Sequence, residues 1–272
     1  MKQEILVGCD PELFVRKDGA RVSGYGLIPG TKSAPHPVDK GAVQVDGMAL
    51  EFNIDPARHS KEFITNIKTV LQQLHSMIPG YDLAVQSVAN FGEEYMKAQP
   101  EAALELGCDP DWNAYTGAIN DRPDGSQHFR TAAGHVHIGW TEGEDVNSSQ
   151  HMSRCMSVVK QLDVILGVPS ILFDKEGGER RKMYGKAGAF RPKPYGVEYR
   201  PLSNKWIGSD SLMEFVFNKT VEGVSMLMSG KAIFASIKDA EDIINTSDEA
   251  RAMQVCEELG LRKAWGGILN MA

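Results

Sequence analysis

The sequence lacks the marks of several protein classes. Its four cysteines include no C-x-x-C pair, which argues against a structural zinc site and fits a reducing compartment. Basic residues are not in excess, because 29 lysines and arginines oppose 36 aspartates and glutamates for a net charge of -7. That balance argues against a broad nucleic-acid-binding surface. No stretch reaches the roughly 18 apolar residues of a membrane span, and the first residues do not form a signal peptide. We therefore expect a soluble, cytoplasmic protein with no nucleic-acid or membrane partner.

The common nucleotide-binding motifs are missing too. In the stretch Gly30-Thr31-Lys32-Ser33 an extra residue separates Gly from Lys, and Gly230-Lys231 is followed by Ala232 where a P-loop requires Ser or Thr. No G-x-G-x-x-G motif follows a predicted strand. The sequence therefore argues against both a P-loop enzyme and a Rossmann dinucleotide site.

The composition that remains is that of an ordinary globular protein. The 272 residues are 42% hydrophobic and 24% charged, which argues against disorder, collagen and coiled coil. This length allows one large α/β or α+β domain or two small ones. Since no low-complexity linker divides the chain, we expect a single domain over 1–272.

Hydrophobic patterning predicts strands first and helices later. Apolar residues recur at helical spacing from Ser60, as N-cap, to Ile78, again over about 146–166, and from about 208 to the end. Residues 107–130 are rich in Gly, Pro, Asn and Asp and are expected to form a long loop. Strand-like segments are 4–8, 12–16, 42–46, 48–54, 81–89, 135–140 and 196–202. This order predicts an α+β fold with a mainly antiparallel sheet and helices packed on one face.

Polar side chains occur in pairs at strand spacing, two residues apart and therefore on one face of a strand. Each pair has apolar neighbours, although any single pair could lie on a solvated sheet face. The four pairs are Asp10 with Glu12, Glu51 with Asn53, His135 with His137, and Glu198 with Arg200.

If these strands are adjacent, their carboxylates crowd onto one face, together with Asp46. Like charges so close repel one another unless cations compensate them. Mg²⁺ or Mn²⁺ suits carboxylate oxygens, and Mn²⁺ also accepts one imidazole. We therefore predict a divalent-metal site dominated by carboxylates, although His135 and His137 could also be a satisfied core pair. Gly134 and Gly139 on either side of the histidines leave room for a ligand or another backbone.

A basic segment, 179–205, interrupts this acidic chain. Such a run could be a solvated loop, but cations beside a divalent metal are also what polyphosphate chemistry requires. Its basic residues are Arg180, Arg181, Lys182, Lys186, Arg191, Lys193, Arg200 and Lys205.

The ordered set of motifs resembles the glutamine synthetase and glutamate-cysteine ligase superfamily, and within it the bacteriophage-associated carboxylate-amine ligases, or type 2 amidoligases. The resemblance rests on residues 8–12, 29–32, 45–53, 134–139, 184–191 and 195–200. It implies a curved antiparallel sheet like the glutamine synthetase catalytic domain, which binds ATP and Mg²⁺ or Mn²⁺ on its concave face. The C-terminal residues from about 208 add nothing diagnostic.

The resemblance also implies roles for particular residues. The implied metal ligands are Asp10, Glu12, Glu51, His135 and Glu198, with the choice between His135 and His137 left open. The implied catalytic residues are Glu51, Arg191 and Arg200. The implied ATP-binding residues are Lys32, His137, Arg180, Arg181, Lys186, Arg191 and Arg200.

The activity implied is carboxylate activation: ATP phosphorylates a carboxylate, and an amine displaces the phosphate to form an amide or peptide bond. The substrates would be small-molecule or peptide acids and amines, with the acceptor pocket built from loops such as 107–130. If the gene is phage-encoded, the site of action is the host cytoplasm. Two alternatives are a metal-dependent hydrolase that uses His135, His137 and carboxylates, and a non-catalytic binding protein with the same fold. Sequence does not determine the oligomeric state.

Overall fold

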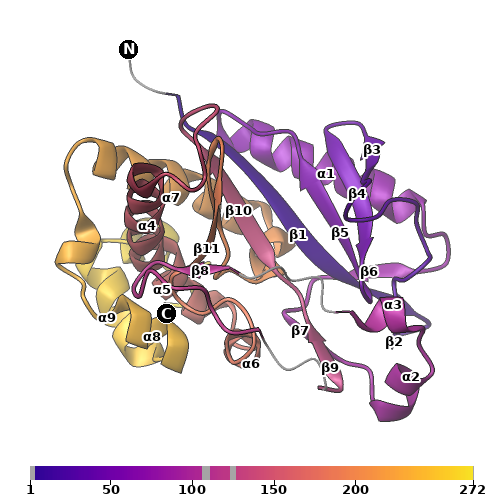
Figure 1. Ribbon diagram of the computed structural model, residues 1–272. Helices are drawn as coiled ribbons and strands as arrows, with labels where there is room; N and C mark the ends of the chain where they lie inside the picture. Colours follow the sequence, from indigo (N-terminus) through magenta and orange to yellow (C-terminus); the bar gives the residue numbers. More distant parts are fainter. Residues whose placement is uncertain (1–3, 106–110, 123–126, 272) are drawn as a thin grey trace.

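The computed structural model describes residues 4–105, 111–122 and 127–271 (Figure 1). These residues form one large sheet with the strand order β3-β4-β5-β1-β10-β12-β11-β8, and β2 and β6 also pair with β1. Every pairing in this sheet is antiparallel. Its strands are β1 (Leu6–Lys17), β2 (Ala20–Val22), β3 (His36–Val38), β4 (Gly41–Asp46), β5 (Ala49–Ile54), β6 (Asp82–Ala84), β8 (Trp112–Asn113), β10 (Gly134–Gly139), β11 (Ala189–Lys193) and β12 (Gly196–Tyr199). β7 (Val88–Asn90) and β9 (Phe129–Thr131) pair separately. The predicted mainly antiparallel sheet is confirmed.

The remaining elements are helices, and from residue 208 to the end of the described chain all elements are helical, as predicted. The first long helix begins at Ser60, which the sequence predicts to be its N-cap. The N-cap is instead His59, whose Nδ1 accepts from Glu62 N. The helices are α1 (Ser60–Ser76), α2 (Glu93–Lys97), α3 (Glu101–Leu104), α4 (Ser149–Leu162), the π-helix η1 (Asp163–Gly167), α5 (Val168–Phe173), α6 (Gly177–Arg181), η2 (Asn204–Gly208), α7 (Asp210–Met228), η3 (Ile233–Ala235), α8 (Ala240–Thr246), α9 (Glu249–Glu258) and α10 (Arg262–Trp265).

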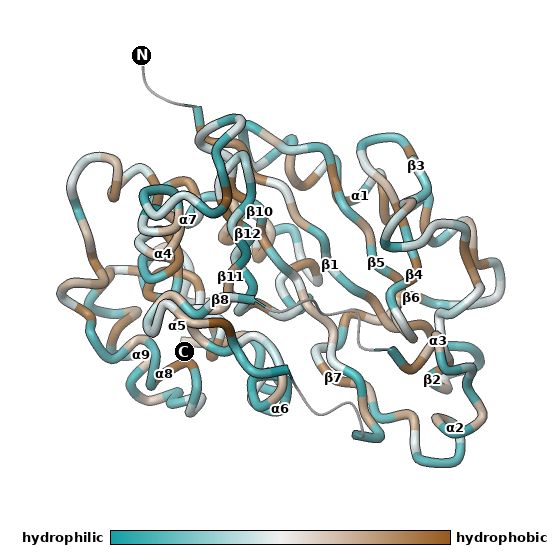
Figure 2. Tube along the Cα trace, in the orientation of Figure 1, coloured by the Kyte–Doolittle hydropathy of each residue, from teal (hydrophilic) through white to brown (hydrophobic). Residues whose placement is uncertain are grey.

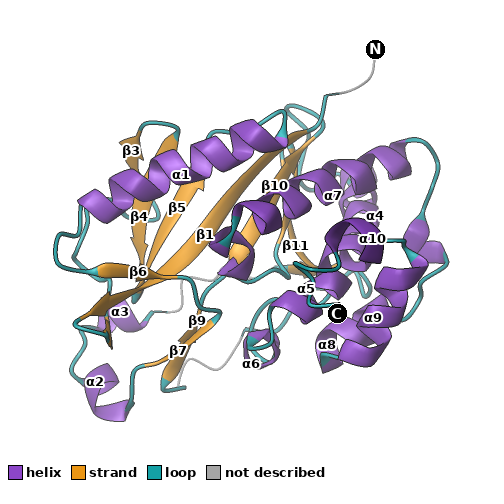
Figure 3. Ribbon diagram, turned by 180° about the vertical axis from the view of Figure 1, so that it is seen from behind, coloured by secondary structure: helices purple, strands orange, loops and turns teal. Residues whose placement is uncertain are grey.

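One face of the sheet is covered and the other is open. Seen from behind, α1 and α7 lie across the strands (Figure 3), and α4 packs on β11 and β12. Strand residues that face these helices are apolar, such as Cys9, Val136 and Tyr199, and all are buried. Alternating hydrophilic and hydrophobic residues along the strands (Figure 2) leave the opposite face polar.

The segments α4, η1 and α5 run on without a break. Ser149–Phe173 is the one stretch of described helix long and apolar enough to cross a membrane, a stretch that the sequence did not lead us to expect. Of its most apolar window, 78% is buried inside the molecule. That burial is typical of a core helix.

The basic segment is more ordered than a loop. Its middle forms β11, which pairs with β12 across a turn at Pro194 and Tyr195. Part of the predicted long loop 107–130 lies outside the described residues, and the rest contributes β8 and the first residues of β9.

Candidate functional site

The strand register brings the predicted polar pairs together on the open face. Asp10 lies opposite His135 in the pairing of β1 with β10, and Glu12 lies opposite Glu51 in the pairing of β1 with β5. His137 lies opposite Glu198, which in turn lies opposite Arg191. The prediction that these strands are neighbours is therefore confirmed, and the apolar residues between the polar ones point into the core.

Asp10, His135 and Glu198 converge at the centre of this face. Asp10 Oδ1 lies 3.2 Å from His135 Nδ1, and Glu198 Oε1 lies 3.6 Å from the same nitrogen. One ligand atom from each of the three residues falls within 4.8 Å of the other two. Burial, with the positive charge of Arg200, lowers the pKa of His135 to about 4, so its imidazole is neutral at pH 7 and can donate a lone pair.

His137 has different surroundings. Its Nδ1 is hydrogen-bonded to the Tyr195 hydroxyl, and its Nε2 lies 3.0 Å from Asp10 Oδ2. Burial would lower the pKa of His137, but the charge of Asp10 raises it above its usual value. Both ring nitrogens have protein neighbours, but Nε2 has no hydrogen-bond partner among the described residues, and His137 is not part of the group formed by Asp10, His135 and Glu198.

The glycine beside these histidines has a packing role. A Cβ at Gly134 would lie 2.4 Å from Ser203 O and 2.6 Å from Trp206 Nε1. The room that this glycine leaves is therefore taken by another part of the chain, which fixes the start of β10 and so the position of His135.

A second carboxylate group lies beside the first. Burial and then the charge of Asp46 raise the pKa of Glu12 to about 7. Burial and the charges of Asp10 and Asp46 raise the pKa of Glu51 well above its usual value, and burial raises that of Asp46. Glu12 Oε2 accepts from Ala133 N at 2.8 Å, and Glu51 Oε2 accepts from Gln44 Nε2 at 2.7 Å. These acids have too little positive charge around them to ionise together.

Cations surround Glu198 on its other side. Lys193 Nζ lies 2.8 Å from Glu198 Oε2, Arg191 Nη1 lies 3.5 Å from Oε1, and Arg200 donates to Oε1. Burial opposes ionisation of Glu198, but Arg200 holds its pKa well below the usual value. Arg200 is itself held by Asp111, whose Oδ2 lies 2.9 Å from Nε.

These groups line an open cavity of about 350 Å³. Lys32 reaches its wall, although Lys32 lies far from the other basic residues in sequence. The predicted site residues in this lining are Asp10, Glu12, Lys32, Glu51, His135, His137, Arg191, Glu198 and Arg200. Arg181 is buried beside Asp174, and Lys186 is exposed, so these two predicted ATP contacts are not among the described lining residues.

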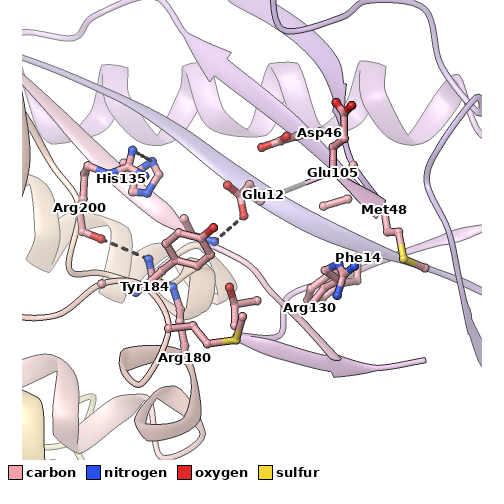
Figure 4. A pocket seen from close by; sticks show the side chains of 16 residues that line it. Glu12, Phe14, Asp46, Met48, Glu105, Arg130, His135, Arg180, Tyr184 and Arg200 are labelled. Carbon is pink, nitrogen blue, oxygen red and sulfur yellow. Dashed lines mark hydrogen bonds between the residues drawn. The ribbon is translucent and has the colours of Figure 1, made fainter. Parts of the chain in front are cut away.

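A smaller cavity of about 60 Å³ continues from Glu12 and Asp46 (Figure 4). Arg180 lines it and is only 1% exposed. It donates from Nη1 to Pro201 O and from Nη2 to Arg200 O. Arg180 therefore supports the backbone of Arg200 and does not reach the larger cavity.

The donor set fits a divalent cation. Asp10 Oδ1 is buried without a hydrogen-bond partner among the residues that the structure describes. Two carboxylates and a neutral imidazole around one point match the preferences of Mn²⁺ and Mg²⁺, and a cation would also offset the repulsion among Glu12, Glu51 and Asp46. The residues present thus suit the predicted metal chemistry.

Sequence reasoning gave no individual role to several lining residues. Lys193 lies two residues after Arg191 on β11, a spacing that would have revealed it had the segment been identified as a strand. Gln44 shows the same alternation with Asp46 on β4. Asp111, which is not among the lining residues, was given no role either, because its link to Arg200 exists only in the folded chain.

Comparison with protein families bears on the class of reaction. Residues 124–223 match the model of the family described as phage phiEco32-like COOH.NH2 ligase type 2. This match spans β10, the basic segment and β12, and it confirms the resemblance to the carboxylate-amine ligases. A comparison with curated proteins finds no significant match.

Among solved structures, the chain is similar to a bifunctional glutathione synthetase from Pasteurella multocida, with a TM-score of 0.47 and 10% identity. The alignment covers 98% of this chain and 46% of that one, so the chain spans about half the length of this neighbour.

Proposed function

We propose that the protein is an ATP-dependent carboxylate-amine ligase, ADP-forming, whose catalytic sheet resembles that of glutamine synthetase. One observation carries the proposal: a single open sheet face holds Asp10, His135 and Glu198 beside Arg191, Lys193 and Arg200. Metal-ligating groups next to several cations are what transfer of a phosphoryl group from ATP requires. The match to a COOH.NH2 ligase family supports the same class of reaction.

The chemistry balances with these groups. The γ-phosphoryl group of ATP passes to a substrate carboxylate, giving ADP and an acyl phosphate. The amine then attacks the acyl carbon, the new C–N bond forms, the C–O bond to phosphate breaks, and the ammonium proton leaves to a base. A bound Mg²⁺ or Mn²⁺ would be held by Asp10, His135 and Glu198 and would neutralise phosphate charge.

The chain's own residues then have separate roles. Arg191 and Arg200 bind the transferring phosphoryl oxygens, because they already surround a carboxylate in the cavity. Lys32 extends this positive wall toward Asp46. Glu51 and Glu12, on the second carboxylate group, complete the metal site or accept the amine proton. The whole chain would form one ligase domain acting in the cytoplasm on small-molecule or peptide substrates.

Glu198→Gln tests the proposal directly. Wild-type protein should release phosphate from ATP only with Mg²⁺ or Mn²⁺ and a suitable acid and amine pair, found by mass spectrometry of mixtures of amino acids. Glu198→Gln should remove turnover and weaken metal-dependent ATP binding at least tenfold, while Glu222→Gln on the surface of α7 should change neither. Tight stoichiometric zinc without affinity for ATP would instead favour a metal-dependent hydrolase and overturn the ligase.

A further inference from the structure

The smaller cavity has features that the phosphoryl-transfer chemistry does not use. Arg130, in β9, forms part of its wall and is 7% exposed. Its Nη1 donates to Gln127 O and Phe129 O at 2.8 and 3.0 Å, and its Nη2 donates to Leu104 O at 3.2 Å. A guanidinium carries five N–H groups, so these three acceptors leave two of them unused.

Arg130 has no ion-pair partner among the described residues, although Glu105 lines the same cavity. Within the described ranges no carboxylate lies within ion-pair distance of it, and its buried Nε has no hydrogen-bond partner. Burial lowers the pKa of Arg130, which expresses the cost of keeping this cation out of water. Since a buried cation is normally paired, the arrangement indicates that the partner is a bound anion.

Acidic groups occupy the other side of the same cavity. In the view of Figure 4, Glu12 and Asp46 lie above Arg130 and Arg180. Like Arg130, Arg180 has a buried Nε without a hydrogen-bond partner among the described residues. The cavity thus has basic and acidic groups on different sides, and Glu12 and Asp46, together with His135 and Arg200, also line the larger cavity.

The size of the cavity limits what could bridge these walls. A volume of about 60 Å³ holds about four to six water-sized groups. A small α-amino acid has that size and carries one carboxylate and one ammonium group. A second carboxylate directed at Glu12 and Asp46 would be repelled, whereas an amine is attracted there.

We propose that this cavity binds the amine substrate and that this substrate is an α-amino acid whose own carboxylate is held by Arg130. The inference rests on the proposed ligase function. The amine end points to Glu12, where the acyl phosphate would form, and the carboxylate at Arg130 does not react. Ammonia and simple amines, which lack this carboxylate, would be poor substrates.

Binding measurements test this without any need for turnover. The twenty proteinogenic amino acids are titrated by saturation-transfer NMR, and those that bind are compared with their amides. At least one amino acid should bind, and its amide should bind at least tenfold more weakly. Arg130→Gln should weaken the amino acid at least tenfold and leave the amide unchanged, while Arg154→Gln, on the surface of α4, should behave as wild type.

Two further controls keep the outcome clear. Arg130 donates to three backbone carbonyls, so its replacement could disturb the fold, and Arg130→Lys, which retains the charge, is measured in parallel. The comparison of the amino acid with its amide is made on wild-type protein and needs no variant. The proposal is overturned if no amino acid binds or if the amide binds equally well. ATP binding with Mg²⁺ is measured separately: its loss with intact amino-acid binding would refute the ligase function alone.

Discussion

Asp10 and His135 face each other directly across β1 and β10, with Asp10 Oδ1 3.2 Å from His135 Nδ1. Asp10 Oδ1 has no hydrogen-bond partner among the described residues, so the two atoms are close but not aligned for a hydrogen bond. The second oxygen of Asp10 is near His137 instead. Burial opposes ionisation of Asp10, but the two histidines hold its pKa well below the usual value, so it is a carboxylate at pH 7.

This arrangement predicts different roles for the two histidines. His135→Ala removes a neutral imidazole from the group that converges with Glu198, and it should weaken Mn²⁺ binding at least tenfold. His137→Ala leaves that group intact and should weaken Mn²⁺ binding only a few-fold, by freeing Asp10. Mn²⁺ titration followed by electron paramagnetic resonance measures both. Equal losses in the two variants would contradict the assignment of His135 as the ligand.

The second carboxylate group predicts a gain of stability on neutralisation. The pKa of Glu12 is raised to about 7, so at pH 8 the folded protein holds a carboxylate that burial and Asp46 disfavour. Glu12→Gln can still accept from Ala133 N, and it should raise the free energy of unfolding by about 1 to 2 kcal/mol without metal.

Added Mg²⁺ should have the reverse effect in this comparison. It should stabilise the wild-type protein more than Glu12→Gln, since the carboxylate is what a cation compensates. Urea unfolding at pH 8 with and without Mg²⁺ measures both effects. Glu142→Gln, at an exposed position outside this group, is the control and should match wild type. A metal-free Glu12→Gln protein that is less stable than wild type would refute the claimed repulsion.

How far sequence could predict this site depends on how local each signal is. Alternation along single strands correctly placed Asp10 with Glu12 and His135 with His137 on one face. The partnership of Lys193 with Glu198 was missed, because Pro192 and the turn after β11 hide a strand in the basic segment. Arg130 gave no pattern at all, because its contact with the carbonyl of Leu104, 26 residues earlier, exists only in the folded chain.

A buried acid behind the sheet predicts a pH-dependent stability. Asp163, in η1, accepts from Tyr199 Oη at 2.8 Å and from Gly188 N at 2.7 Å. Burial raises its pKa to about 7, although the bonds from Tyr199 and Gly188 act against this rise.

The sign follows from proton linkage. A raised pKa means that the folded protein binds the proton more tightly than the unfolded chain, so this stability is present at low pH and is lost as pH rises through about 7. Asp163→Asn cannot ionise. Between pH 5 and 8 wild type should therefore lose on the order of a few kcal/mol relative to Asp163→Asn. Urea unfolding at several pH values measures the difference, and parallel curves for the two proteins would contradict the prediction.

A glycine near Arg180 predicts a loss of both stability and activity. Gly185 has φ +75°, and a Cβ there would lie 1.9 Å from Arg180 Nη1. Gly185→Ala must therefore displace the side chain that holds Arg200 O and Pro201 O. Gly26 is the matched control, because it has φ +78° and open space around it.

The two variants separate backbone strain from displacement of Arg180. Gly26→Ala should cost about 1 kcal/mol through backbone strain alone, and Gly185→Ala about 1 to 3 kcal/mol more. Thermal unfolding measures the stability, and ATP turnover should fall only in Gly185→Ala. Similar losses in both variants would mean that the Arg180 contact is unimportant.

The antiparallel pairing of β1 with β10 has a consequence for how the protein folds. Asp10 and His135 are separated by more than a hundred residues of chain, so the neighbourhood of the central acids exists only after a large loop has closed. Pairings of this kind form slowly, and no short fragment of the chain can contain the metal-ligating group. A divalent cation should therefore bind late in refolding, slow unfolding more than it speeds folding, and report completed assembly of the sheet.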